Sequence, residues 1–264
     1  MTVMTQRVTQ ARVVQSEWTK LRSLRSSVLS LLAAVVFIIG FSALVPAVIA
    51  AHWPPHDPAD RLGFDPTSVS LAGVFLAQLA IGVLGVLLVT GEYATGMIRA
   101  TFAAVPRRLP VLWAKAAVFA AAALAVTVPA VIVAFLIGQS ILSSQHIQTS
   151  LGQPGVLRAV IGTSLYLTVV GVLGLALGAL LRNTAGAIAT LFGSLFVLPV
   201  IVHFLPSTWS DHINKYLPSE AGQAMTRVHH EANTLSPWVG LLVFVLYAVV
   251  ALAAAAVLMR RRDT

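Results

Sequence analysis

Six long stretches without a charged residue dominate this 264-residue sequence. They lie at residues 26–56, 66–91, 116–157, 159–181, 183–210 and 232–259. A charge at the centre of a membrane helix costs about 2.5–3.5 kcal/mol, and a helix needs about 20 apolar residues to cross the hydrocarbon core. With 58% hydrophobic and 10% charged residues, the composition lies far outside the range of soluble domains. The pattern predicts an all-α fold, a polytopic membrane helical bundle.

Each charge-free stretch predicts one transmembrane helix. The third is long enough for two, but its second half, residues 138–155, is polar and glycine-rich and is typical of a loop. Six spans are therefore expected. They lie at about residues 28–51, 69–90, 110–137, 157–181, 185–205 and 238–259, in a single domain over residues 1–264 with an outer segment at 206–237.

The distribution of lysine and arginine predicts the orientation in the membrane. An even number of spans places both termini on one side, and basic residues are retained on the cytoplasmic side. Thirteen of the 17 basic residues lie on the side of the termini, whereas four lie on the other side: Arg61, Arg158, Lys215 and Arg227. Both termini and the connection at residues 91–108 are therefore expected in the cytoplasm.

The segment before the first span is basic and amphipathic. Val14, Trp18 and Leu21 recur at i, i+4 and i+7, which predicts an in-plane helix over about residues 8–25 with Trp18 at the headgroup level. The residues expected at the membrane surface are Trp18, Lys20, Arg22 and Arg25. The alternative interpretation is a solvated basic tail that only sets the topology.

The connection at residues 91–108 is a polar and basic island between two spans. It is compatible with a helix from Glu92 to Ala104 that ends before Pro106 and presents an apolar stripe to a groove on a partner. The stripe consists of Tyr93, Met97, Ala100 and Ala104. Alternatively, Glu92 and Arg99 are only charges that flank a span. Lys115, near the start of the third span, is expected to extend its side chain to water.

Several kinds of chemistry are not indicated by the sequence. It has no GxxxxGK[ST], HExxH or GxSxG motif, no cysteine, and no acid or histidine in the middle of a span. Its basic residues are not gathered with aromatic residues into one patch, so no nucleic-acid partner is expected. We expect no cofactor, no metal and no catalytic residue in this chain. Energy for any transport has to come from outside it.

Three stretches carry a resemblance to a known family: residues 16–26, residues 91–108 and residues 216–222. The second is the most specific and is similar to the pattern EY..G.IR.T..A.P.R. Together with the span layout, they resemble a type-2 ABC exporter permease of the kind common in actinobacteria. The resemblance covers nearly the whole chain. It implies a multi-pass subunit of the bacterial plasma membrane, with the in-plane start as an elbow helix.

The resemblance also implies partners and sites. Two permease subunits, identical or homologous, would each dock on one of two copies of a cytoplasmic ATPase that holds ATP and Mg²⁺, a separate protein because this chain shows no ATPase domain. The connection would contain the coupling helix, and the outer segment would gate the exit. The coupling residues are Glu92, Tyr93, Gly96, Met97, Arg99, Thr101, Arg107 and Arg108, and the gate candidates are Tyr216, Leu217, Pro218 and Glu220.

Two other functions remain open from the residues alone. One is a self-contained secondary carrier or channel. The other is a membrane-embedded enzyme that acts on lipid through polar residues on the outer side. Its candidate residues are His203, His212, His229, His230 and Glu231. The transported substrate is open as well, because small apolar side chains in the spans suit a lipid-like, drug-like or peptide substrate equally.

Overall fold

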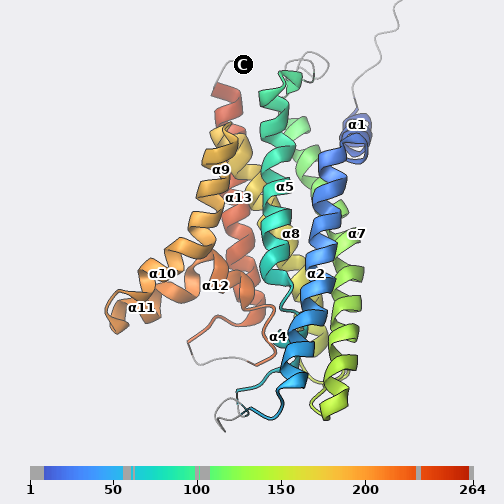
Figure 1. Cartoon of the computed structure of the whole chain (residues 1–264). Coiled ribbons are helices and arrows are strands. Elements are labelled where there is room, and N and C mark those ends of the chain that lie inside the picture. The colour runs from blue at the N-terminus through green and yellow to red at the C-terminus, as the bar shows by residue number, and fades with distance from the viewer. Residues whose placement is uncertain are drawn as a thin grey trace, which may run out of the picture.

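The computed structural model describes residues 9–55, 61, 63–98, 101, 108–229 and 233–261. Within these residues there are helices, turns and loops but no strand. Among the described residues, six helices are long and apolar enough to cross a membrane, which agrees with the predicted all-helical fold and number of spans. They are Arg25–Ala51, Val74–Ala94, Leu109–Gln145, Val156–Leu181, Thr184–His203 and Pro237–Arg261. They run side by side in Figure 1, except that the last part of Thr184–His203 turns away from the bundle.

The elements follow in this order: α1 (Gln10–Ser23), α2 (Arg25–Ala51), α4 (Pro66–Ser70), α5 (Val74–Ala94), α7 (Arg108–Leu142), η1 (Ser143–Gln145), α8 (Val156–Leu181), α9 (Thr184–Phe192), η2 (Gly193–Val197), α10 (Leu198–His203), α11 (Ser207–Ile213), η3 (Asn214–Tyr216), α12 (Pro218–Gln223) and α13 (Pro237–Arg261). Helices α1 and α4 lie at opposite ends of the bundle (Figure 1). We call these the α1 end and the α4 end.

The second span begins later than predicted, because a separate short helix precedes it. Asp65 caps α4 by accepting a hydrogen bond from the backbone N–H of Thr67 at 2.9 Å. Helix α4 ends at Ser70, and the chain then turns so that Gly73 lies against the backbone of α2. A side chain at Gly73 would collide with the carbonyl of Phe37. The close approach of the two backbones explains the turn before Val74.

The third span is longer than predicted, so the loop expected at residues 138–155 begins only after η1. Gln139 is buried inside the bundle. Its Nε2 donates to the carbonyl of Pro66 at 3.0 Å and to Ser70 Oγ at 2.9 Å. Its Oε1 accepts from the N–H of Thr149 at 2.6 Å. The polar residues here fasten α7 to α4, which allows the helix to continue.

Helices α5 and α8 pack through glycines. An added Cβ at Gly174 would lie 2.6 Å from the carbonyl oxygen of Gly82, and one at Gly178 would lie 2.9 Å from that of Val86. The GxxxG face of α8 therefore serves close packing within the chain. Most of α8 is buried: 72% of its most apolar window, against 17% for α2.

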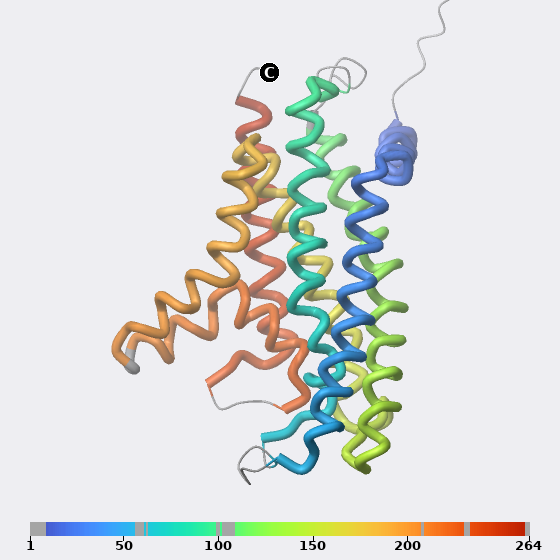
Figure 2. Tube along the Cα trace, viewed as in Figure 1, coloured from blue at the N-terminus to red at the C-terminus, as the bar shows by residue number. Residues whose placement is uncertain are grey.

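The turn between α8 and α9 places one residue in the left-handed conformation. Arg182 holds this position at the end of α8, with φ of 53°. Asn183 follows it and caps α9, and its Oδ1 accepts from the N–H of Gly186 at 2.7 Å. Further along, the π-helical η2 and Pro199 interrupt the span. Figure 2 shows α10 and α11 leaving the bundle sideways beyond this point.

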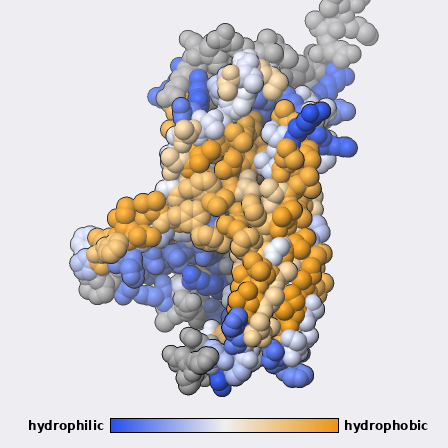
Figure 3. All heavy atoms as spheres, in the orientation of Figure 1, coloured by the Kyte–Doolittle hydropathy of each residue, from blue (hydrophilic) through white to orange (hydrophobic). Residues whose placement is uncertain are grey.

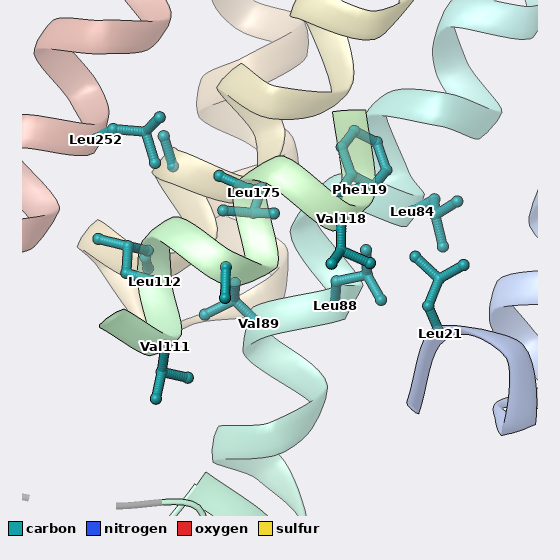
Figure 4. Close-up of a cluster of buried hydrophobic side chains, with 14 of the residues drawn as sticks. Leu21, Leu84, Leu88, Val89, Val111, Leu112, Val118, Phe119, Leu175 and Leu252 are labelled. Atoms are coloured by element: carbon teal, nitrogen blue, oxygen red, sulfur yellow. The ribbon is translucent and has the colours of Figure 1, made fainter. Parts of the chain in front are cut away.

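Apolar side chains fill the bundle and cover much of its surface. Figure 4 shows one buried cluster, in which Leu21 of α1 lies close to Leu84 and Leu88 of α5. Valine, leucine and phenylalanine side chains from α7, α8 and α13 complete it. On the face shown in Figure 3, hydrophobic residues spread over the middle of the molecule, and hydrophilic residues gather at the two ends and beneath the arm that projects to the left. This distribution suits a chain that crosses a membrane.

Candidate functional site

Helix α1 lies across the end of the bundle, and Figure 1 views it nearly along its axis while the long helices run up the page. Its buried residues are Val13, Glu17 and Leu21, spaced four apart on one face. Of the stripe predicted to lie in the membrane surface, Leu21 is buried against the protein, whereas Val14 and Trp18 are 36% and 41% exposed. The protein packs against the neighbouring face of α1, and the position of Val14 and Trp18 in the membrane surface stays a prediction.

The buried face of α1 delivers a charge into a four-residue ionic cluster, formed by Glu17, Lys20, Glu92 and Lys115. We call it the charge cluster. Lys115 Nζ donates to Glu17 Oε2 at 2.5 Å and to Glu92 Oε1 at 2.9 Å. Lys20 Nζ donates to Glu17 Oε1 at 2.7 Å and to Glu92 Oε1 at 3.1 Å. Each ammonium thus contacts both carboxylates, and α1, α5 and α7 are joined at one point.

The charge cluster is shielded from solvent. Glu17, Glu92 and Lys115 are 4%, 3% and 7% exposed. Removing ions from water costs several kcal/mol each, so such charges are stable only when they are paired with good geometry. Two carboxylates and two ammoniums balance here, although Glu92 Oε2 finds no hydrogen-bond partner among the described residues.

Lys20 lies at the edge of the charge cluster. Burial lowers the pKa of its ammonium, but the hydrogen bond and charge of Glu17, together with the charge of Glu92, outweigh burial and raise the pKa above its ordinary value of 10.5. Lys20 therefore stays charged at neutral pH. Lys115 was expected to reach water, and this was wrong: its head group is buried between Glu17 and Glu92.

The connection begins directly at the charge cluster. Glu92 lies in the last turn of α5, which ends at Ala94. The helix predicted to run unbroken from Glu92 to Ala104 was wrong, because the chain turns at Gly96 with φ of 71°, a conformation that favours glycine. Beyond the turn, Thr101 Oγ1 accepts from Lys20 Nζ at 3.2 Å. The charge cluster thereby also holds the connection.

The two residues after the turn differ in exposure. Ile98 is buried in the same apolar cluster as Leu21 and Leu88, whereas Met97 is 37% exposed. On the neighbouring side, the Arg182 guanidinium lies 5.0 Å from the ring centroid of Tyr93. The end of α5 is therefore held both by α1 and α7 and by the turn between α8 and α9.

The other predicted coupling and surface residues are placed only in part. Arg99 and Arg107 lie outside the described residues, and Arg108 is described only as the first residue of α7. Arg22 and Arg25 are exposed at the end of α1 and the start of α2. Of the predicted surface residues, the structure therefore brings only Lys20 into the charge cluster with Glu92.

The gate candidates lie far from the charge cluster, at the α4 end. The chain breaks between two short helices here, since η3 ends at Tyr216 and Pro218 begins α12. Leu217 and Pro218 are buried, and Glu220 Oε2 accepts from Arg227 Nη2 at 3.0 Å. The carbonyl of Tyr216 accepts from the hydroxyl of Tyr247 on α13 at 3.1 Å. The segment is thus anchored on the bundle.

Two members of the charge cluster were missed as site residues by the sequence reasoning, Glu17 and Lys115. A signal for each was present. Glu17 lies in phase with Val13 and Leu21, so all three share one helical face. Lys115 follows the start of an apolar run, where a lone charge needs a partner of opposite sign. Glu17 and Glu92 are the two acids on the same predicted side ahead of it in the sequence.

The histidines considered for lipid chemistry are not brought together where the structure describes them. His203, His212 and His229 lie in α10, in α11 and after α12, while His230 and Glu231 lie outside the described residues. No group of three histidine, aspartate or glutamate side chains within the described residues is arranged to hold a metal.

The charge cluster links the connection to three helices, so a movement of the connection would act on all three. The chain matches no protein-family model, and no curated protein matches it.

Proposed function

We propose that this chain is the permease subunit of an ATP-driven exporter, paired with a second permease subunit and driven by a separate cytoplasmic ATPase that binds ATP and Mg²⁺. The observation that carries the proposal is the charge cluster at the start of the connection. A motor that moves the connection moves Glu92 and Thr101, and their contacts pass the movement to α1 and α7. The family resemblance of residues 91–108 points to the same role.

The connection suits docking on a motor because its two sides differ. Ile98 is anchored in the apolar core, and Met97 offers a flexible apolar side chain to a partner. The turn at Gly96 separates Met97 and Ile98 from the membrane helix α5. Apolar side chains of a short segment can bind in a hydrophobic groove on a partner.

In this proposal the α1 end faces the cytoplasm and the α4 end faces outward. Trp18 then lies at the headgroup level, on the side of α1 that faces away from the protein. Only 17% and 22% of the most apolar 18-residue stretches of α2 and α13 are buried, so these spans face lipid or the second permease subunit. The segment at residues 216–220 is the candidate gate at the exit.

The proposal is tested by purifying the tagged full chain from membranes of its source and identifying the bound proteins. A P-loop ATPase is expected to co-purify and to hydrolyse ATP in the complex. In the Met97→Asp variant a carboxylate enters the docking groove. An interface hot spot is worth about 2 kcal/mol or more, so retention of the ATPase should fall about tenfold or more. Ser144→Asp adds the same charge at an exposed site in η1 and should retain the ATPase normally.

Equal retention of the ATPase by the wild type and Met97→Asp would contradict the docking role. Absence of any ATPase from the wild-type preparation would contradict the proposed function itself. Transport by the purified chain alone in proteoliposomes would instead support a secondary carrier or channel.

A further inference from the structure

Helix α1 has an exposed stripe beside the face that packs on the bundle. Val14, Trp18 and Arg22 follow one another at i, i+4 and i+8, so they lie along one side of the helix. All three residues are exposed, although two of them are apolar. Such a combination suits the boundary between hydrocarbon and lipid head groups, where an apolar ring and a charged group each find a favourable surrounding.

The first half of α2, which runs down from α1 in Figure 2, carries a second exposed stripe. Arg25, Leu29, Leu32 and Val36 recur at i, i+4, i+7 and i+11, so they share one face of the helix. The three apolar residues are 64%, 54% and 65% exposed. From Arg25 to Val36 the helix rises about 16 Å, which is about half the thickness of the hydrocarbon core. The stripe therefore matches the length of an acyl chain in one leaflet, with Arg25 at the level of the phosphate.

The exposed surface where α1 meets α2 is positively charged. Glu17 is the only acidic residue among residues 1–56, and it is buried in the charge cluster. Arg22 and Arg25 are exposed, and in the part of the chain that the structure describes no ion pair joins either of them to a carboxylate. Since the acid of α1 is used inside the protein, both guanidinium groups are available to phosphate oxygens outside it.

The two stripes together distinguish between possible anionic partners. An acidic protein surface or a soluble phosphate would pair with the arginines but would leave the apolar side chains of α2 uncovered. A phospholipid pairs its phosphate with the arginines, places its head-group region beside Trp18 and covers the α2 stripe with an acyl chain. A zwitterionic head group brings no net charge to the two arginines, so a head group with net negative charge is favoured.

We propose that the junction of α1 and α2 binds a phospholipid with a net negative charge. Arg22 and Arg25 contact its phosphate, and an acyl chain follows Leu29, Leu32 and Val36. The lipid lies in the leaflet at the α1 end. This binding requires only that the chain lies in a membrane, and it is independent of the ATPase and of the proposed transport function.

The test measures which lipid lies beside α2 in the reconstituted full chain. Because the chain contains no cysteine, Val28→Cys introduces a single thiol next to the stripe, at a position that is 41% exposed. A bimane fluorophore on this thiol is measured in phosphatidylcholine bilayers that contain equal fractions of brominated phosphatidylglycerol or brominated phosphatidylcholine. The concentration dependence of quenching gives the relative affinity of the two lipids. Phosphatidylglycerol should bind about tenfold or more tightly than phosphatidylcholine, because each arginine at an anionic membrane surface strengthens binding about fivefold.

Variants of the labelled protein identify the charges that bind the lipid. Arg22→Gln and Arg25→Gln should each lower the preference for phosphatidylglycerol about fivefold, and the double variant should remove it. Arg260→Gln is the matched control, because it removes an exposed arginine from the last turn of α13 and should keep the preference. A label at Val239→Cys, which is 49% exposed at the start of α13, should show no preference between the two lipids.

Equal quenching by the two lipids at position 28 would overturn the proposal, and so would a preference that survives in the double variant. Quenching at position 239 but not at position 28 would show that a protein covers the stripe, which also overturns it. If the double variant does not fold, salt decides the question in the labelled parent protein. Raising NaCl from about 0.1 M to about 1 M should remove most of the preference, and a preference that does not change with salt would overturn the proposal.

Discussion

Helix α7 carries a buried polar side chain near each end, and the two differ in chemistry. Lys115 joins α7 to α1 and α5 through charges, whereas Gln139 joins it to α4 through neutral hydrogen bonds. Both side chains belong to residues that are 7% exposed, and both have partners far away in the sequence. The two side chains thus differ mainly in charge, and comparing them shows how charge affects the contribution of a buried polar contact to stability.

The difference lies in what remains when the fastening is removed. Loss of a neutral partner leaves unpaired donors and acceptors, while loss of a charged partner leaves a charge in a medium that solvates it poorly. Loss of one partner should therefore destabilise the protein more in the charge cluster than in the hydrogen bonds of Gln139. The charge cluster also lies where the connection begins, the place where a motor would act under the proposed function.

The largest effect is expected from Lys115→Met. This change leaves Glu17 and Glu92 buried, with Lys20 as the remaining cation of the charge cluster. Breaking a buried ion pair costs about 3–5 kcal/mol, so the free energy of unfolding should fall by about that amount. Denaturant unfolding of the purified chain in detergent measures it.

Adding Glu17→Gln and Glu92→Gln to Lys115→Met serves as the control, because it removes the uncompensated charges and should recover much of the loss. If Lys115→Met lowers the free energy of unfolding by less than Gln139→Leu does, the buried charges do not matter more to stability than the neutral hydrogen bonds at the other end of α7.

Gln139→Leu should have the next largest effect. It removes the donor to the Pro66 carbonyl and to Ser70 Oγ and leaves the N–H of Thr149 without its acceptor, and the expected loss is about 1–3 kcal/mol in the same unfolding measurement. Ser140→Ala is the matched control, since the Ser140 hydroxyl is exposed and bonds only within α7 to Ile137. It should change stability by less than about 0.5 kcal/mol. A neutral result for Gln139→Leu would show that the α4 end is held by apolar packing alone.

Lys20→Met should have the smallest effect, about 1 kcal/mol or less at neutral pH, because the Lys20 side chain is 22% exposed and water screens its pairing. The pH dependence identifies the charge. Since the folded-state pKa of Lys20 is raised above 10.5, its contribution is fully present below pH 10.5 and is lost as the pH rises through the raised value.

The measurement is the Tm difference between wild type and Lys20→Met as the pH rises from neutral to above the raised pKa. This difference should disappear in the alkaline range, while the difference for Gln139→Leu should stay constant. A Lys20→Met difference that does not change with pH would show that the ammonium contributes no charge interaction.

The sequence predicted the six spans well because the cost of burying charge is local and large. It could not predict which face of α1 packs on the bundle. Trp18 is exposed, and a residue at the edge of a membrane can be apolar and still face away from the protein. The hydrophobic pattern of α1 therefore does not distinguish lipid from core.

Long-range pairing explains the remaining errors. Gln139 suggested a loop because its partners Pro66 and Ser70 lie 73 and 69 residues away in the chain. Lys115 was read as a border of the apolar run, because a scan for single charges cannot show that Glu17, 98 residues earlier, neutralises it. The turn at Gly96 depends on how the end of α5 is held, so local propensity alone predicted a longer helix.

The most direct test of the account is a photo-crosslink from the connection in living cells. Benzoylphenylalanine is placed at Met97, which is 37% exposed at the α1 end, and for comparison at Trp209, which is 64% exposed in α11. The account predicts a crosslink from position 97, and not from position 209, to a protein that carries a P-loop ATPase motif. Crosslinks to such a protein from both positions, or from neither, would contradict it.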